Sequence, residues 1–177
     1  MQLKHFNNYS GWLGINKQVG ISSAKIVHKI KKMINIKKVG HAGTLDPLAS
    51  GVLPIALGEA TKTIKYAMHS FKSYEFDISW GAATETEDLE GKVISSSDIR
   101  PTKNEITNAL PNFLGTIRQK PPLYSAIKID GTRSYKLARK SIKIDIPERD
   151  VFIKSFKLLE EIDENKARFV VECGKGV

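Results

Sequence analysis

The residues best suited to chemistry lie in one glycine-rich stretch, 40–62, which reads Gly-His-Ala-Gly-Thr-Leu-Asp-Pro-Leu-Ala-Ser-Gly-Val-Leu-Pro-Ile-Ala-Leu-Gly-Glu-Ala-Thr-Lys. Its Asp46 is the only acidic residue between His5 and Leu57, in the most positively charged quarter of the chain. Pro47 fixes its own φ and favours an extended backbone at Asp46. A carboxylate in such surroundings is either paired with a cation or neutralised by burial, which makes Asp46 a candidate catalytic group.

Local chemistry alone leaves a structural role open and favours it. An Asp-Pro pair more commonly forms an Asx turn or a helix cap. A lone histidine such as His41 is likewise more often structural than catalytic. No second His or Cys stands at metal-ligand spacing, so we expect no zinc site. The glycine pattern matches neither the phosphate-binding loop nor the dinucleotide fingerprint, so we expect no nucleotide cofactor.

A strand and an amphipathic helix precede this stretch. Residues 11–16 predict a short strand that enters a turn, and Ser22 or Ser23 can cap the helix that follows. Apolar residues recur along that helix at helical spacing, and three lysines fall on its other side: Lys25, Lys29 and Lys32. Solvated lysines on a surface helix suffice to explain this pattern, although the same face could line an RNA path.

The other elements alternate without a regular βαβ rhythm. They are a buried strand at 52–57 with Pro54 near an edge or bulge, a short helix at 59–68, a half-buried strand at 74–80, a helix opened by the capping box Thr102–Glu105 and ended by Pro111, and a β-hairpin of 151–159 and 166–173. We therefore predict an α+β fold, with a mixed, largely antiparallel sheet flanked by helices, in one compact unit over residues 1–177.

Composition excludes several classes of protein. With 177 residues, 41% hydrophobic and 27% charged, the chain has the composition of a soluble globular protein rather than a disordered one. No stretch approaches the roughly 18 consecutive apolar residues of a membrane span, and the N-terminus lacks the pattern of a signal peptide. The single cysteine, Cys173, cannot form an internal disulfide. We therefore expect a cytoplasmic protein, a monomer, with no membrane contact.

The net charge of +9 is concentrated in two blocks. Residues 1–75 carry +8 and residues 118–143 carry +7, separated by residues 76–117 at −4. Two basic blocks suggest two arms of a surface that binds a polyanion, with an affinity that falls steeply with salt. Charge alone is equally consistent with a protein that is merely basic and soluble.

Residues 40–62 as a whole resemble the signature of the TruB-type tRNA pseudouridine synthases. Other segments resemble that family in the same order: 17–20 its Lys-Pro-x-Gly turn, 72–76 its aromatic strand, 81–91 its acidic loop, and 119–128, with Gly131 and 137–139, the segment that closes over the RNA. The resemblance runs from about Trp12 to the last residue.

The resemblance implies an enzyme that isomerises uridine 55 in the T-loop of tRNA without metal or cofactor. Such an enzyme must flip its target base out of the RNA stack. By the family pattern Asp46 is the catalytic carboxylate that attacks the substrate covalently, which requires its ionised form. We expect it charged at the floor of a cleft. Tyr74 would stack on the flipped uracil, although packing in the core is its alternative role.

The resemblance also assigns the residues around the pocket. Substrate binding is expected from His41, Lys17, Gly43, Thr44 and Leu45. Contacts to RNA phosphates, which position the loop without reading its bases, are expected from Arg118, Lys120, Lys128, Arg133 and Arg139. An RNA-binding or RNA-folding module without catalysis is the alternative function.

The sequence departs from the family pattern in three places. Gln18 replaces a proline, and Glu85 stands where the family more often has Asp. Residues 172–177 begin the motif Cys-x-Lys-Gly-x-Tyr-Ile-Arg but stop before its Tyr and Arg, so we expect a truncated chain of weak or no activity. In the family that arginine pairs with the catalytic aspartate. A buried Asp46 without this cationic partner should therefore have a raised pKa, unless Lys17 compensates. The final strand should be left as an exposed edge.

Overall fold

The computed structural model describes residues 7–122, 128–129, 132–134 and 146–177. They fall into two compact units, unit 1 (Met1–Ser70) and unit 2 (Phe71–Val177), where the sequence analysis expected one. Among the described residues, unit 1 contains one cluster of buried apolar side chains and unit 2 contains two, and no cluster includes residues of both units. The α+β class is confirmed, and every strand pair described is antiparallel. No helix in the described ranges is long and apolar enough to cross a membrane.

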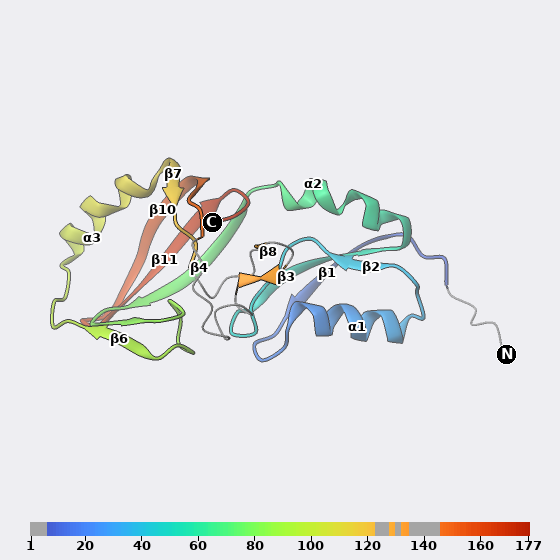
Figure 1. Cartoon of the computed structure of the whole chain (residues 1–177), viewed down its shortest axis with the longest axis horizontal. Coiled ribbons are helices and arrows are strands. Elements are labelled where there is room, and N and C mark those ends of the chain that lie inside the picture. The colour runs from blue at the N-terminus through green and yellow to red at the C-terminus, as the bar shows by residue number, and fades with distance from the viewer. Residues whose placement is uncertain (1–6, 123–127, 130–131, 135–145) are drawn as a thin grey trace. The chain divides into compact units, whose positions relative to one another are not determined.

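Unit 1 is a three-stranded sheet with a helix on one face (Figure 1). Its strands β1 (Gly11–Lys17), β3 (Gly51–Leu57) and β2 (Val39–His41) lie in the order β1-β3-β2. Helix α1 (Ser23–Met33) packs its apolar side against the strands, and the 3-10 helix Gly58–Thr63 leads into α2 (Ile64–Met68). The predicted cap is confirmed, because the Ser22 hydroxyl accepts a hydrogen bond from the Lys25 amide.

Pro54 lies in the central strand of this sheet, and the pairing with β1 has no register shift there, so its predicted place near an edge or bulge was wrong. The Pro54 carbonyl accepts a hydrogen bond from the Ala42 amide at 2.9 Å, on the β2 side. The N–H and C=O of one strand residue point to the same side of the strand. The N–H that proline lacks would therefore also have pointed toward β2. Pairing of β2 with β3 ends there, at His41, and the ladder with β1 continues undisturbed.

Unit 2 is built on a four-stranded sheet. Its strands β4 (Lys72–Ser79), β11 (Lys166–Cys173), β10 (Arg149–Asp163) and β7 (Gly115–Gln119) lie in that order. Short strand pairs are formed by β5 (Ala82–Thr84) with β6 (Val93–Ser96), and by β8 (Lys128–Ile129) with β9 (Thr132–Arg133).

The last strand, β11, is a central strand, so the expectation of an exposed edge was wrong. It pairs with β10 through the predicted hairpin and with β4, more than eighty residues earlier in the chain. Its residues alternate between partly exposed and buried along the whole strand. Both sides of the strand therefore have backbone partners, and its apolar face has a core to enter.

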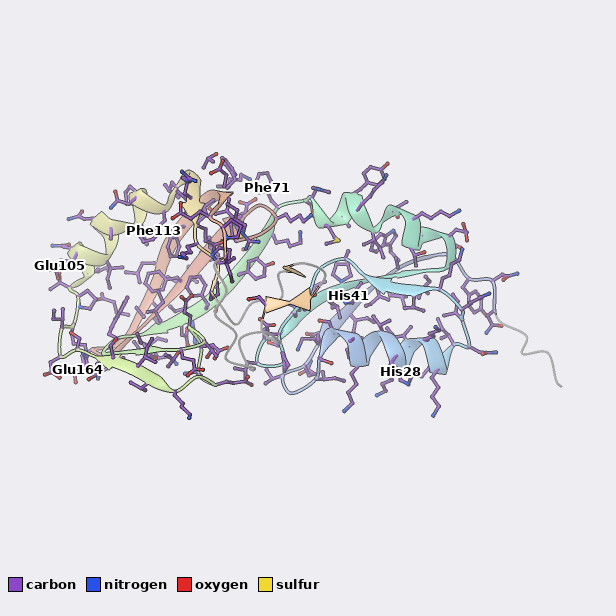
Figure 2. The ribbon with its side chains drawn as sticks, viewed as in Figure 1. His28, His41, Phe71, Glu105, Phe113 and Glu164 are labelled. Carbon is purple, nitrogen blue, oxygen red and sulfur yellow. The ribbon has the colours of Figure 1, made fainter. Side chains whose placement is uncertain are left out.

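One end of the sheet in unit 2 is covered by α3 (Lys103–Ala109) and the 3-10 helix Leu110–Phe113. The predicted capping box is present at Thr102 and Glu105. Helix α3 ends at Ala109, and Pro111 sits in the 3-10 turn that follows. Ile106 enters the core beside Phe169, and the ring of Phe113 (Figure 2) meets that of Phe156 edge-on at 5.9 Å.

The opposite face of this sheet carries ion pairs between neighbouring strands. Arg168 donates to both carboxylate oxygens of Asp77, at 2.7 and 3.2 Å, and Lys166 lies 3.0 Å from the same group. Hydrogen bonding from Arg168, and then from Lys166, lowers the pKa of Asp77 to about 2. The carboxylate is thus stabilised in its charged form by the folded sheet.

We expect Asp77→Asn to reduce the amount of folding stability that the protein loses in acid. A carboxyl whose pKa is lowered on folding contributes fully above its unfolded value, near 4, and loses that contribution as the pH falls toward 2. Urea unfolding midpoints should therefore fall less between pH 4 and pH 2 in Asp77→Asn than in the parent chain. Asp150→Asn, on β10, is the control, and an equal effect of the two substitutions would contradict the prediction.

Candidate functional site

Asp46 lies in the loop of unit 1 that joins β2 to β3. Its carbonyl accepts a hydrogen bond from the Ala49 amide at 3.0 Å, which closes a tight turn over Pro47 and Leu48. This is a backbone turn rather than the Asx turn or helix cap considered for the Asp-Pro pair, because its hydrogen bond uses the main-chain carbonyl of Asp46. It leaves the side-chain carboxylate of Asp46 available for other work.

Ser23, at the start of α1, holds the residue just before Asp46. Its hydroxyl donates to the Leu45 carbonyl at 2.9 Å and accepts from the Leu45 amide at 3.0 Å. The Ser23 side chain is buried, and the Leu45 side chain packs against the core of unit 1. Sequence reasoning considered Ser23 only as a possible cap, because a contact across 22 residues leaves no local signal.

A second connection holds the residue just after Asp46. The Gly20 amide donates to the Pro47 carbonyl at 2.7 Å. Gly20 has φ +87, a left-handed conformation that glycine adopts at little cost. The catalytic candidate is thus bracketed by hydrogen bonds from the two ends of the segment 20–23.

Lys17 supports this segment from inside. Its side chain is fully buried, and its ammonium donates to the carbonyls of Gln18 at 3.0 Å and Ile21 at 2.8 Å. Across the described ranges no ion pair joins Lys17 to Asp46. Lys17 therefore stabilises the 17–21 turn. Its ammonium hydrogen-bonds to main-chain carbonyls and is not seen paired with the Asp46 carboxylate.

His41 ends β2, and its Nδ1 donates to the Gly43 carbonyl (Figure 2). A carbonyl can only accept, so this contact places the proton on Nδ1 and makes Nε2 the acceptor in the neutral ring. Gly43 has φ +122, which disfavours any residue with a Cβ. Thr44, next in the loop, is exposed.

The Asp46 side chain is exposed, which corrects the expectation of a carboxylate buried at the floor of a cleft. Leu45 takes the position that faces the core, so its neighbour is left facing solvent. Burial therefore does not remove the Asp46 carboxylate from solvent. A pocket of about 380 Å³ in unit 1 lies among Tyr9, Ile36 and Gly58, near the other end of β1 and β3.

Tyr74 lies on β4 of unit 2, opposite Val171 of β11. It is 37% exposed and shares the sheet face that holds Phe76 and Phe169. Burial of part of the ring, and then the nearby Cys173, raise the pKa of the phenol above its ordinary value. The Tyr74 ring is thus neutral, partly buried and partly accessible. This position is compatible with both roles considered for it, packing in the core and stacking on a flipped base.

The residues expected to bind RNA phosphates fall in or after β7. Arg118 is exposed and lies 3.3 Å from Glu148, and Lys120 is exposed just beyond the strand. Lys128 and Arg133 lie in the short pair β8–β9, where only the backbone is described. Arg139 lies outside the described residues.

The arrangement in unit 1 can present a carboxylate for nucleophilic or general-base chemistry. The backbone on both sides of Asp46 is held by buried or short hydrogen bonds, while its oxygens face solvent. In the described ranges no group of three or more His, Cys, Asp or Glu side chains could hold a metal ion.

Removing the Ser23 hydroxyl should loosen this loop. Ser23→Ala leaves a backbone amide and a carbonyl without their buried partner, so we expect a loss of about 1–3 kcal/mol of stability. The Leu45 amide should also exchange with solvent faster, measured by hydrogen exchange. Ser22→Ala, which removes the helix cap and leaves the contact with Leu45 intact, is the matched control. Equal exchange at Leu45 in the two variants would contradict the prediction.

Comparison with known proteins places these residues in a family. The family model described as TruB family pseudouridylate synthase (N terminal domain) matches residues 31–177. Two curated relatives, each named tRNA pseudouridine synthase B, come from Ehrlichia chaffeensis (52% identical over 168 residues) and Rhizobium johnstonii (54% over 167 residues). The matches cover 94% of this chain but 57% and 54% of those proteins. The chain thus spans about half the length of these relatives.

Solved structures have the same fold. A chain in a crystal structure of a Cbf5-Nop10-Gar1 complex is 27% identical with a TM-score of 0.67, over 96% of this chain and 41% of that one. A chain in an H/ACA RNP bound to a substrate RNA containing 2′-deoxyuridine matches at TM-score 0.65 and 24% identity, over 94% and 38%. The family model and the curated relatives confirm the resemblance found in the sequence, and the chain belongs to the TruB family of pseudouridylate synthases.

Proposed function

We propose that this chain isomerises uridine to pseudouridine in tRNA, at position 55 of the T-loop, with Asp46 as the catalytic carboxylate. The names of the curated relatives support the reaction and the class of RNA. The observation that carries the proposal is the bracketed loop, in which Ser23 and Gly20 hold the peptides before and after an exposed Asp46.

The reaction breaks the N-glycosidic bond of a uridine, turns the base and rejoins it through carbon. The target base must first leave the RNA stack. Asp46 then attacks the substrate through an oxygen that the turn presents to solvent, either at the sugar C1′, which displaces the uracil, or at the C5–C6 double bond of the ring. The bond to Asp46 breaks again as the product forms, in which C1′ is joined to C5, the C5 proton is released and N1 carries a proton. A backbone held on both sides limits the motion of the carboxylate, which favours attack geometry.

The remaining assigned residues act around this step. Tyr74 stacks on the flipped uracil, His41 helps to hold the opened loop, and Lys17 braces the turn that carries Gly20. The loop residues Gly43, Thr44 and Leu45 also bind the substrate. The phosphates are bound by Arg118, Lys120, Lys128, Arg133 and Arg139.

Tritium release from RNA tests the proposal. A T-loop hairpin with 5-tritiated uridine is mixed with an excess of protein, so that even slow conversion is seen in a single turnover. We expect the 177-residue chain to convert uridine at position 55. No conversion in this single-turnover assay would overturn the proposal.

An RNA-binding or RNA-folding role without catalysis is the second candidate. It is favoured by one observation: within the described ranges Asp46 forms no ion pair with any basic side chain. This alternative predicts salt-dependent RNA binding that Asp46→Asn leaves unchanged, with no pseudouridine formed.

A further inference from the structure

Helix α1 exposes a row of basic side chains that the proposed chemistry does not use. Lys25, Lys29 and Lys32 are all exposed, and His28 lies among them on the same helix (Figure 2). At 100° per residue these four positions fall within about a third of the helix circumference, opposite the apolar side that packs on the strands. We call Lys25, Lys29 and Lys32 the α1 lysine row.

In the part of the chain that the structure describes, the α1 lysine row forms no ion pair. Residues 7–70 contain two acidic residues, Asp46 and Glu59. Glu59 is already paired with Lys38 at 2.7 Å and Lys62 at 2.5 Å, and hydrogen bonds from these lysines lower its pKa to about 2.

Several basic side chains on the sheet of unit 2 are paired with acidic residues. Lys154 of β10 lies 2.8 Å from Glu172, and Lys166 and Arg168 of β11 lie within 3.0 Å of Asp77. The charges of those cations are balanced by carboxylates on neighbouring strands of the sheet. The α1 lysine row keeps its full charge for an external anion.

The row also begins beside the candidate site. Ser23, two residues before Lys25, is the residue whose hydroxyl holds Leu45 next to Asp46. From Lys25 to Lys32 the helix extends about 10 Å, enough to follow several phosphates of a nucleic-acid backbone. The positive row therefore leads from the candidate catalytic loop along one exposed helix face.

We propose that the α1 lysine row binds the phosphate backbone of the substrate RNA, in the stem next to the target loop. This inference rests on the proposed function, because it takes RNA as the substrate. Lysine ammonium groups on a helix surface act as point charges, so the contact is independent of base sequence. Its contribution is affinity and orientation, separate from the chemistry at Asp46.

Salt-dependent binding of a labelled T-arm hairpin tests the proposal. In the triple variant Lys25→Gln, Lys29→Gln, Lys32→Gln we expect affinity near 0.1 M salt to fall about tenfold or more, and the slope of log affinity against log salt to fall by about 2–3. The matched control removes three paired lysines instead, Lys38→Gln, Lys154→Gln and Lys166→Gln. It lowers the net charge equally and should change the slope little.

Three further measurements make the test decisive. A Lys→Arg triple variant should bind as the parent chain does, and circular dichroism should show the same helix content in all variants. A hairpin whose stem is cut to a few base pairs should lose most of the difference between the parent and the Gln variant. An unchanged slope in the Gln variant, an equal loss in the control, or the same loss with the short stem would overturn the proposal.

This outcome is separable from failure of the proposed function. If the parent chain forms pseudouridine and the Gln variant binds RNA normally, the α1 lysine row is a solvated surface and the enzyme assignment stands. If the parent chain binds RNA through the row but forms no pseudouridine, the row stands and the enzyme assignment fails.

Discussion

Asp46→Asn is expected to lower the single-turnover rate of pseudouridine formation by about a thousandfold or more, since removal of a covalent nucleophile commonly costs at least this much. Asparagine keeps the size and shape of the side chain and removes its charge. The hydrogen bond that closes the turn uses the Asp46 carbonyl of the main chain, so the loop should keep its form. The exposed side chain makes little contribution to the core.

The loss should therefore appear in the rate alone. Tritium release gives the rate, while hairpin affinity and the urea midpoint should match the parent protein. Asp98→Asn, an exposed acid outside the site, is the matched control and should retain full activity. Activity that survives in Asp46→Asn would remove Asp46 from the mechanism.

Phe169→Ala is expected to be the most destabilising single change in unit 2. Phe169 is 1% exposed, and its ring lies 5.6 Å from that of Phe156, 5.9 Å from Phe76 and 6.4 Å from Trp80. Truncating a buried aromatic side chain costs about 3–5 kcal/mol, through lost burial and the cavity left behind. Because Phe76 shares β4 with Tyr74, the loss should also disturb the strand that carries the proposed stacking residue.

Urea unfolding followed by Trp80 fluorescence measures this loss. The chain has two tryptophans, so a Trp12→Phe background leaves Trp80 as the reporter of unit 2. Phe169→Leu should cost less than Phe169→Ala, because it leaves a smaller cavity. Phe152→Ala is the matched control, since that ring is 44% exposed. Comparable midpoint shifts for Phe169→Ala and Phe152→Ala would contradict the packing argument.

Local signals in the sequence predicted individual elements well. Ser22 capped α1, the box at Thr102 and Glu105 opened α3, and the alternation at 74–80 marked β4. Each of these signals is complete within a few residues, because a cap or a two-residue period depends on near neighbours. The family resemblance rested on a longer run, 40–62, and the comparisons confirmed it.

Relations between distant segments escaped the same reasoning. Nothing local places β4 beside β11, so the last strand was expected at an edge and is central. Pro54 was expected near an edge and lies in the middle strand of unit 1, tolerated because β2 ends beside it. Strand order depends on which distant strands share a core, and no single window contains that information.

The sequence by itself determined the family, the identity of the candidate carboxylate and the position of the basic residues, because each is a matter of residue type and order. Tertiary structure alone decided how Asp46 is presented. Ser23 and Gly20 reach it from another part of the chain, Lys17 turns inward to carbonyls, and Leu45 takes the buried position that leaves the acid exposed. Hydrogen bonds and burial between distant residues exist only once the chain has folded.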